Sequence, residues 1–144
     1  MQHIEYMKYA LNMAEKAQNV GEVPVGAVIT KDNEVIATGY NQTISKNDIM
    51  QHAEVVAIQS AFKYLNNFRL HDCSLYVTLE PCMMCLGLIL SSRVNNLYIG
   101  LADHKNGIIS NNKLDFSQHN INIYNDIMHR ESNKLIKSFF QSRR

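Results

Sequence analysis

Two cysteines and a histidine in this sequence have the types and spacing of metal ligands. Cys82 and Cys85 stand three residues apart directly after Pro81, at the expected start of a helix, so both sulfur atoms project from one face. The unpaired N–H groups and partial positive charge of a helix N-terminus favour the thiolate form that a metal binds. Two thiolates and the imidazole of His52 suit Zn²⁺ and leave the fourth tetrahedral position open to water.

Glu54 follows His52 by two residues and could serve the same site. In the middle of a helix the two side chains would point about 200° apart, so they can face one metal only where a helix begins. The apolar stripe of the next expected helix does begin at Ala53, which allows this geometry. Two helix N-termini would then converge on one metal, with the Glu54 carboxylate beside a metal-bound water.

Other interpretations of these residues are open at this point. The two cysteines alone could be a redox pair or two buried neighbours, and a lone His or Glu at a helix start is usually a cap or a solvated residue. Their joint occurrence at helix starts favours the metal site. Three ligands beside a carboxylate also favour an open, catalytic zinc site over a closed structural one.

The elements that must position these residues alternate between helices and strands. The periodicity predicts helices over 4–14, 52–65 and 81–90, strands over 25–29, 35–40, 75–79, 97–99 and 121–124, and a final helix through 135–140. In that last helix we expect Leu135, Ile136, Phe139 and Phe140 to face inward. Such an order predicts an α/β fold with three layers, a central sheet covered by helices on both faces.

Composition limits the class of protein. The chain has 144 residues, of which 46% are hydrophobic and 19% charged, so it is expected to form a single domain over residues 1–144 and not a disordered chain. The formal net charge is +1, but residues 129–144 hold five basic residues and one acidic residue. The preceding residues hold nine basic and twelve acidic residues. A basic C-terminal segment on a mildly acidic body hints at a polyanionic partner.

Three cysteines and the absence of a secretory pattern argue against a disulfide framework and predict a reducing compartment, the cytoplasm. The longest apolar run, residues 83–90, is much shorter than the roughly 18 residues that a membrane span needs. We therefore expect no membrane association. The same apolar helix predicts burial at the centre of the fold or at a subunit interface.

Together these motifs resemble those of the cytidine deaminase-like superfamily and, within it, the bacterial tRNA-specific adenosine deaminases. The combination of His52-x-Glu54 with Pro81-Cys82-x-x-Cys85 is typical of zinc nucleobase deaminases. Residues 22–28 and the close cysteine spacing after residues 78–80 are similar to the tRNA branch. Further matching positions are Asn41, Gly87, Ser92, Arg93, Gly100, Asp103, Lys105, Gly107, Phe139 and Phe140.

This resemblance implies a mixed five-stranded sheet and deamination of the wobble adenosine of a tRNA anticodon to inosine. One zinc ion per subunit would be held by His52, Cys82 and Cys85, with Glu54 as the proton shuttle and zinc-bound hydroxide as the nucleophile. The resemblance assigns the remaining site residues as Asn41 (hydrogen bond to the flipped base), Val25 and Ala53 (base pocket), Asp103 and Lys105 (near the anticodon nucleotides), and Phe140, Arg143 and Arg144 (possible tRNA contacts). It also implies a homodimer that binds the anticodon stem-loop.

Two alternatives compete with that function. Small-molecule deaminases that act on guanine, cytosine or a deoxycytidylate share His-x-Glu and Pro-Cys-x-x-Cys, although residues 22–28 and the basic C-terminal helix favour tRNA. A non-catalytic RNA-binding subunit that keeps zinc for folding is the second alternative. The intact Glu54 argues against it, because a structural zinc site has no use for a shuttle carboxylate.

Overall fold

Four helices and five strands make up the fold of residues 2–143, the part of the chain that the computed structural model describes. They are α1 (Gln2–Asn19), β1 (Gly26–Lys31), β2 (Glu34–Tyr40), α2 (Ala53–Leu65), β3 (Cys73–Leu79), α3 (Met83–Ser91), β4 (Asn96–Leu101), β5 (Asn122–Tyr124) and α4 (His129–Gln141). All of the expected elements are present, most of them within a few residues of the predicted bounds. Within the same residues, no helix combines the length and the apolar character that crossing a membrane requires.

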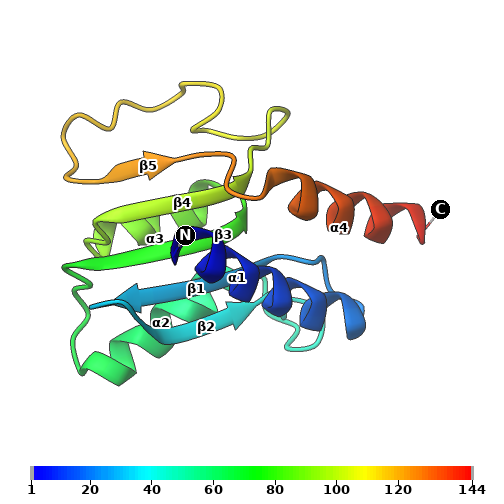
Figure 1. Ribbon diagram of the computed structural model, residues 1–144, viewed down its shortest axis with the longest axis horizontal. Helices are drawn as coiled ribbons and strands as arrows, with labels where there is room; N and C mark the ends of the chain where they lie inside the picture. Colours follow the sequence, from blue (N-terminus) through cyan, green and yellow to red (C-terminus); the bar gives the residue numbers. More distant parts are fainter. Residues whose placement is uncertain (1, 144) are drawn as a thin grey trace.

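The five strands form one mixed sheet in the order β2-β1-β3-β4-β5. Strand β1 pairs antiparallel with both β2 and β3, whereas β3, β4 and β5 are parallel to one another. Helices α1 and α4 cover one face of the sheet, and α2 and α3 cover the other (Figure 1). This arrangement confirms the three-layer fold with a mixed sheet of five strands.

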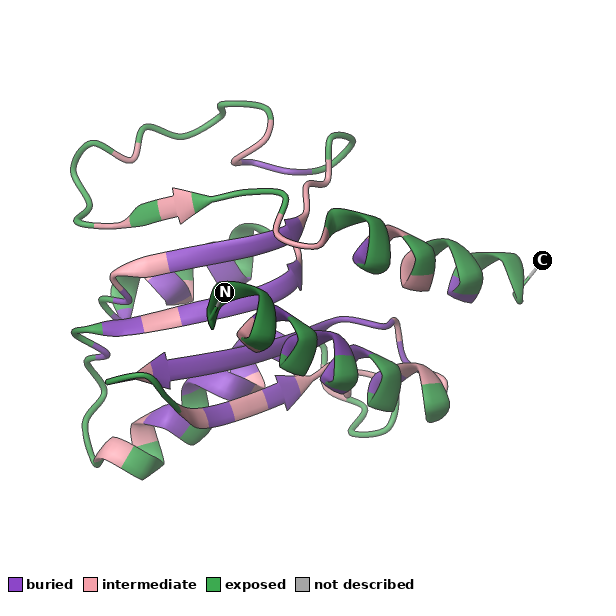
Figure 2. Ribbon diagram, in the orientation of Figure 1, coloured by how far each residue is buried: buried purple, intermediate pink, exposed green. Residues whose placement is uncertain are grey.

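The core consists of two layers separated by the sheet, because successive strand side chains point to opposite faces. Val28, Tyr76 and Tyr98 pack with α1 in the smaller cluster. Their neighbours along the strands, such as Ala27 and Leu75, belong to the larger cluster with α2 and α3. The central strands are accordingly buried along most of their length, while the outer faces of the helices are exposed (Figure 2).

Three tyrosines stack across the parallel half of the sheet on the face that α1 covers. Tyr76, Tyr98 and Tyr124 stand opposite one another in the registers of β3, β4 and β5. The ring centroids of Tyr76 and Tyr98 are 4.5 Å apart, and those of Tyr98 and Tyr124 are 4.8 Å apart. Cross-strand aromatic pairs of this kind stabilise a sheet, and here they attach the short edge strand β5.

The C-terminal helix differs from the expectation at one position. Phe139 is buried, but Phe140 is 50% exposed, so the prediction that both face inward is wrong for Phe140. Successive residues of a helix point about 100° apart, so when Phe139 faces the sheet its neighbour Phe140 is turned toward the surface. Leu135 and Ile136, at the other end of the stripe, are half-buried.

The backbone of the first turns of α2 packs directly against β2, because the strand residue at the contact is Gly39, which has no side chain. A β carbon at Gly39 would overlap the carbonyl oxygen of Ala53 and lie 2.7 Å from the backbone nitrogen of Ala57. Gly26 of β1 similarly lets α1 approach, since a β carbon there would lie 2.5 Å from the nitrogen of Ala14. Both obstacles are backbone atoms, which cannot rotate away.

We expect Gly39→Ala to lower the free energy of unfolding by about 3 kcal/mol or more, because α2 must move off the sheet to admit one methyl group. Glu34→Ala, at an exposed position of the same strand, is the matched control and should change it by less than about 0.5 kcal/mol. Urea denaturation followed by circular dichroism measures both. Equal stability of Gly39→Ala and the wild type would show that the contact is not close.

Candidate metal centre and active site

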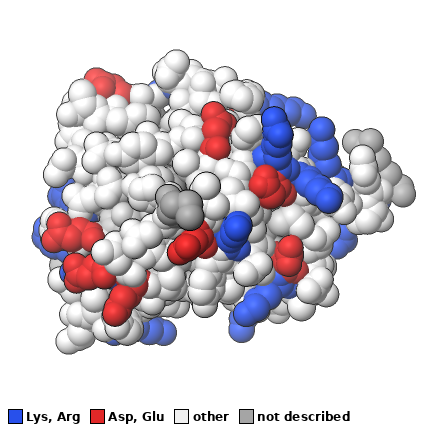
Figure 3. Space-filling view, in the orientation of Figure 1, with Lys and Arg blue, Asp and Glu red and all other residues white. Residues whose placement is uncertain are grey.

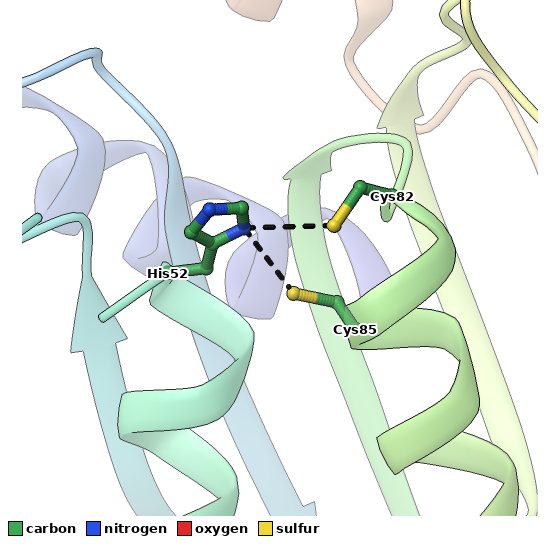
Figure 4. A group of neighbouring side chains, drawn as sticks. All are labelled: His52, Cys82 and Cys85. Carbon is green, nitrogen blue, oxygen red and sulfur yellow. Dashed lines mark hydrogen bonds between the residues drawn. The ribbon is translucent and has the colours of Figure 1, made fainter. Parts of the chain in front are cut away.

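The candidate metal ligands come from the starts of two helices that meet at one end of the sheet. His52 is the N-cap residue of α2 and Cys82 is the N-cap residue of α3, each in an extended backbone conformation. Cys85 lies in the first turn of α3. Figure 4 shows the imidazole and the two sulfur atoms pointing toward one another across the space between the helix starts.

The distances between these donor atoms fit a tetrahedral zinc ion. Nδ1 of His52 lies 3.6 Å from Sγ of Cys82 and 3.4 Å from Sγ of Cys85. Zinc with ordinary bond lengths to nitrogen and sulfur would separate such a pair by about 3.6 Å. Within residues 2–143, no other group of three or more His, Cys, Asp or Glu side chains is gathered closely enough to hold a metal ion. A neutral imidazole that binds through Nδ1 would keep its proton on Nε2.

The two thiols are not equivalent. The hydrogen bond from Cys85 lowers the pKa of the Cys82 thiol to about 5, and nearby backbone N–H groups and His52 act in the same direction. The pKa of Cys85 is raised, first because its thiol donates that hydrogen bond and then because it is buried. Cys82 is therefore the more acidic of the two thiols, and a divalent cation bound between the sulfur atoms would favour the thiolate form of both.

Glu54 is the buried acid of the site, with only 3% of its surface exposed. Burial raises the pKa of its carboxyl to about 7, against smaller opposing effects of its own backbone N–H and of His52. A carboxyl with a pKa near neutrality can both accept and return a proton, as a general acid–base group must. It follows His52 by two residues at the helix start, as the spacing predicts.

A cavity of about 290 Å³ opens beside these groups. Its lining consists of Val23, Val25, Asn41, Thr43, His52, Glu54, Leu79, Glu80, Pro81, Cys82, Asp103 and Asn106. Oδ1 of Asn41 accepts a hydrogen bond from the backbone N–H of Ala53 at 2.9 Å, so Asn41 caps the first turn of α2. Among residues 2–143 no acceptor takes a hydrogen bond from Asn41 Nδ2, which leaves this N–H₂ group available to a ligand in the cavity.

One wall of the cavity is held by a second buried acid, Glu22. Its carboxylate accepts hydrogen bonds from the backbone N–H groups of Ile44 at 3.1 Å and Ser45 at 2.7 Å. Burial alone would raise the pKa of Glu22, but the hydrogen bonds from Ser45, Ile44 and Thr43 outweigh it, so the pKa is lowered. The segment after Asn41, which carries the lining residue Thr43, is therefore fixed from inside the protein.

The structure brings together most of the predicted site residues but not all of them. His52, Glu54, Cys82, Val25, Asn41 and Asp103 all line the cavity, and Cys85 lies beside it. Ala53 is fully buried and does not line the cavity, and Lys105 is exposed outside it.

The predicted residues of the C-terminal helix lie outside the cavity. Arg143 donates a hydrogen bond to the carbonyl of Gly21 at 2.8 Å, and its guanidinium lies 4.5 Å from the ring centre of Phe139. Phe140 is exposed, and Arg144 lies outside the described residues.

Sequence reasoning did not single out Val23, Thr43, Leu79, Glu80 and Asn106 as cavity residues. For Glu80, the sequence did contain a feature that could have indicated its role. Glu80 ends a buried strand directly before the metal-binding turn, and an acid in such a place needs partners that only the folded chain supplies.

Comparison with known proteins finds deaminases among the proteins similar to this chain. A model of the MafB19-like deaminase family matches residues 1–144. The tRNA-specific adenosine deaminase of Haemophilus influenzae is 40% identical over 143 residues, covering 96% of this chain and 83% of that protein.

Two solved structures are also similar. One comes from work on A-to-I editing by tRNA:A34 deaminases at the wobble position of transfer RNA. It has a TM-score of 0.84 and 36% identity, and the match covers 91% of this chain and 98% of that one. A guanine deaminase from Bacillus subtilis is 42% identical over 71% of this chain and 66% of its own, with a TM-score of 0.69.

The resemblance inferred from His52, Glu54, Cys82 and Cys85 is confirmed by these matches, which extend over nearly the whole chain. The chain therefore belongs to the MafB19-like deaminase family, and its relatives group it with the tRNA-specific adenosine deaminases.

Proposed function

We propose that this chain, as a single domain, converts adenosine to inosine at the wobble position of a tRNA anticodon by hydrolytic deamination, with release of ammonia. The observation that carries the proposal is that the buried Glu54 and the His–Cys–Cys group lie together at one small cavity. The relatives named for tRNA adenosine deamination support the choice of substrate.

His52, Cys82 and Cys85 would hold one zinc ion per subunit, which supplies a water molecule of lowered pKa when bound. Glu54 takes the proton of the attacking water and delivers it to N1 of the adenine ring. It then takes the second proton, from the hydroxyl group now on C6, and passes it to the amine, so that the C6–N bond breaks, the C6 carbonyl of inosine forms and ammonia leaves. Burial suits Glu54 to both steps, since a carboxyl with a pKa of about 7 holds a proton between them without being locked in one state.

The remaining cavity residues suit a base that has been extruded from an RNA loop. Asn41 is held at Oδ1 by the backbone of Ala53, so its Nδ2 presents donors in a fixed direction toward an acceptor nitrogen of the ring. Val25 supplies an apolar wall. A nucleotide of an anticodon loop can be splayed out more cheaply than one in a duplex, which favours a loop substrate.

The basic C-terminal helix supports binding of an RNA backbone. Arg130, Lys134 and Lys137 are exposed on α4, and Lys and Arg side chains gather at that end of the molecule (Figure 3). Helix α4 extends from the end of the sheet at which β3 and β4 terminate, the same end that carries the cavity (Figure 1). Only a few phosphates would be contacted, so the salt dependence of binding should be modest. A tRNA substrate and free cysteines are both consistent with action in the cytoplasm.

The substrate is tested by incubating the zinc-loaded protein with an anticodon stem-loop that carries adenosine at the wobble position, and separately with free guanine and cytosine. We expect inosine in the stem-loop and no ammonia from the free bases. A stem-loop with guanosine at that position is the control. The similarity to a guanine deaminase supplies the competing outcome, ammonia from free guanine without inosine in RNA, which would overturn the proposal.

Glu54→Gln should lower kcat for the stem-loop by about 10²–10⁴-fold, because the amide cannot carry the proton although it keeps the side-chain volume. Zinc content and stem-loop affinity should remain at wild-type levels, as measured by elemental analysis and a filter-binding assay. The exposed Glu34→Gln is the matched control. Retention of full activity by Glu54→Gln would mean that another group moves the proton.

We also propose that the chain forms a homodimer through the outer face of α3. This helix contains no charged residue, and it exposes Met83 by 72% and Met84 by 40%. An apolar helix at the surface of a monomer leaves hydrophobic area in water that a second copy could bury.

Gly87→Arg tests the dimer, because within residues 2–143 and apart from the adjoining backbone of α3, no atom lies within 4 Å of a β carbon at this exposed position. The variant should fold as a monomer, since the arginine has room in one chain but places a charge in the interface. Sedimentation velocity at micromolar concentration should show a dimer for the wild type and a monomer for Gly87→Arg. A monomeric wild type would remove the proposal.

A further inference from the structure

Glu80 is a buried carboxylate that the deamination chemistry does not use. It follows the last residue of β3 and directly precedes Pro81 and the metal ligand Cys82. Only 5% of its surface is exposed, and its backbone N–H donates to the carbonyl of Leu101 at 2.9 Å. A buried carboxylate is costly unless hydrogen bonds compensate for the lost water, so its partners indicate its role.

All of the hydrogen-bond partners of this carboxylate within residues 2–143 lie in one loop. Oε1 accepts the backbone N–H of Asp103 at 3.0 Å, and Oε2 accepts those of Ile109 at 3.1 Å and Ser110 at 3.3 Å. The Ser110 hydroxyl also donates to Oε1. The side chain thus joins the two ends of the segment 103–110, which has no helix or strand of its own.

Gly107 closes this loop over the carboxylate. A β carbon at this position would overlap Oε2 of Glu80 and the carbonyl oxygen of Asp103. The loop is also braced by Asn111, whose Nδ2 donates to the Gly107 carbonyl at 2.7 Å. A side chain at position 107 would therefore push the loop away from the carboxylate, which gives a second way to break the same contact.

The loop held in this way forms part of the cavity wall. Asp103 and Asn106 line the cavity together with Val25 and Asn41, and Glu80 itself is among the lining residues. The chain distance from Glu80 to the metal ligand is two residues. One side chain therefore connects the turn that holds the metal to the loop that faces the substrate.

We propose that Glu80 is a positioning residue that fixes the loop 103–110 relative to the metal-binding turn, and so sets how tightly the enzyme binds the nucleotides beside the reacting base. This inference rests on the proposed function for its substrate, but the loop contact itself does not. Loss of the carboxylate should loosen the wall and weaken substrate binding, while the ligands and Glu54 stay in place.

Hydrogen exchange tests the contact without a substrate. In Glu80→Gln, and separately in Gly107→Ala, the amides of Asp103, Ile109 and Ser110 should exchange at least tenfold faster than in the wild type, because each loses a charged acceptor. Amides of α2 and of the control variant Glu34→Gln should keep their rates. Unchanged exchange at the three loop amides in both variants would overturn the proposal.

Kinetics with the wobble-adenosine stem-loop distinguish positioning from a merely structural role. Positioning predicts that KM rises about tenfold in both variants, whereas kcat per bound zinc stays within about threefold of the wild type. A structural role predicts a lower melting temperature or zinc content with an unchanged KM, and that result would overturn the inference. If the wild type did not deaminate the RNA at all, the proposed function would fail and the exchange data alone would decide the role of Glu80.

Discussion

The site depends on two helices that begin at the same place. His52 and Cys82 are both N-cap residues, their side chains point toward one another, and backbone N–H groups in the first turn of α3 lie near the sulfur of Cys82. Helix starts attract negative charge, and here they supply the environment in which a thiolate is stable. The sheet topology explains why the two helix starts meet. Strands β2 and β3 flank β1, and both run antiparallel to it, so they terminate at the same end of the sheet. Strand β2 leads into α2, and β3 leads into α3.

Close packing limits how far this arrangement can shift. Gly39 lets the backbone of α2 rest on β2, and Asn41, two residues later, caps the same helix from the loop side. Glu54 is buried because the first turn of α2 is pressed against the sheet. Its pKa near neutrality is therefore a consequence of backbone packing as much as of its neighbours.

The fold and the His–Cys–Cys group could be predicted from the sequence because they depend on local patterns. Cys82 and Cys85 lie about one helical turn apart, and the short, mostly apolar run of residues 75–79 is typical of a buried strand. Phe140 was misjudged because periodicity shows which residues share a face but not how wide a stripe the sheet covers. The roles of Glu22 and Glu80 were missed because their partners, near residues 44 and 109, lie far along the chain in loops without periodicity.

The stacked tyrosines also have a spectroscopic consequence. The chain has seven tyrosines and no tryptophan, so its near-ultraviolet circular dichroism and its intrinsic fluorescence come chiefly from tyrosine. Tyr76, Tyr98 and Tyr124 lie parallel enough for their electronic transitions to couple, and they belong to three different strands. In the protein without RNA, their signal therefore reports whether the parallel half of the sheet is intact. A tryptophan introduced near the cavity would be the only one in the chain and would report its own surroundings without background.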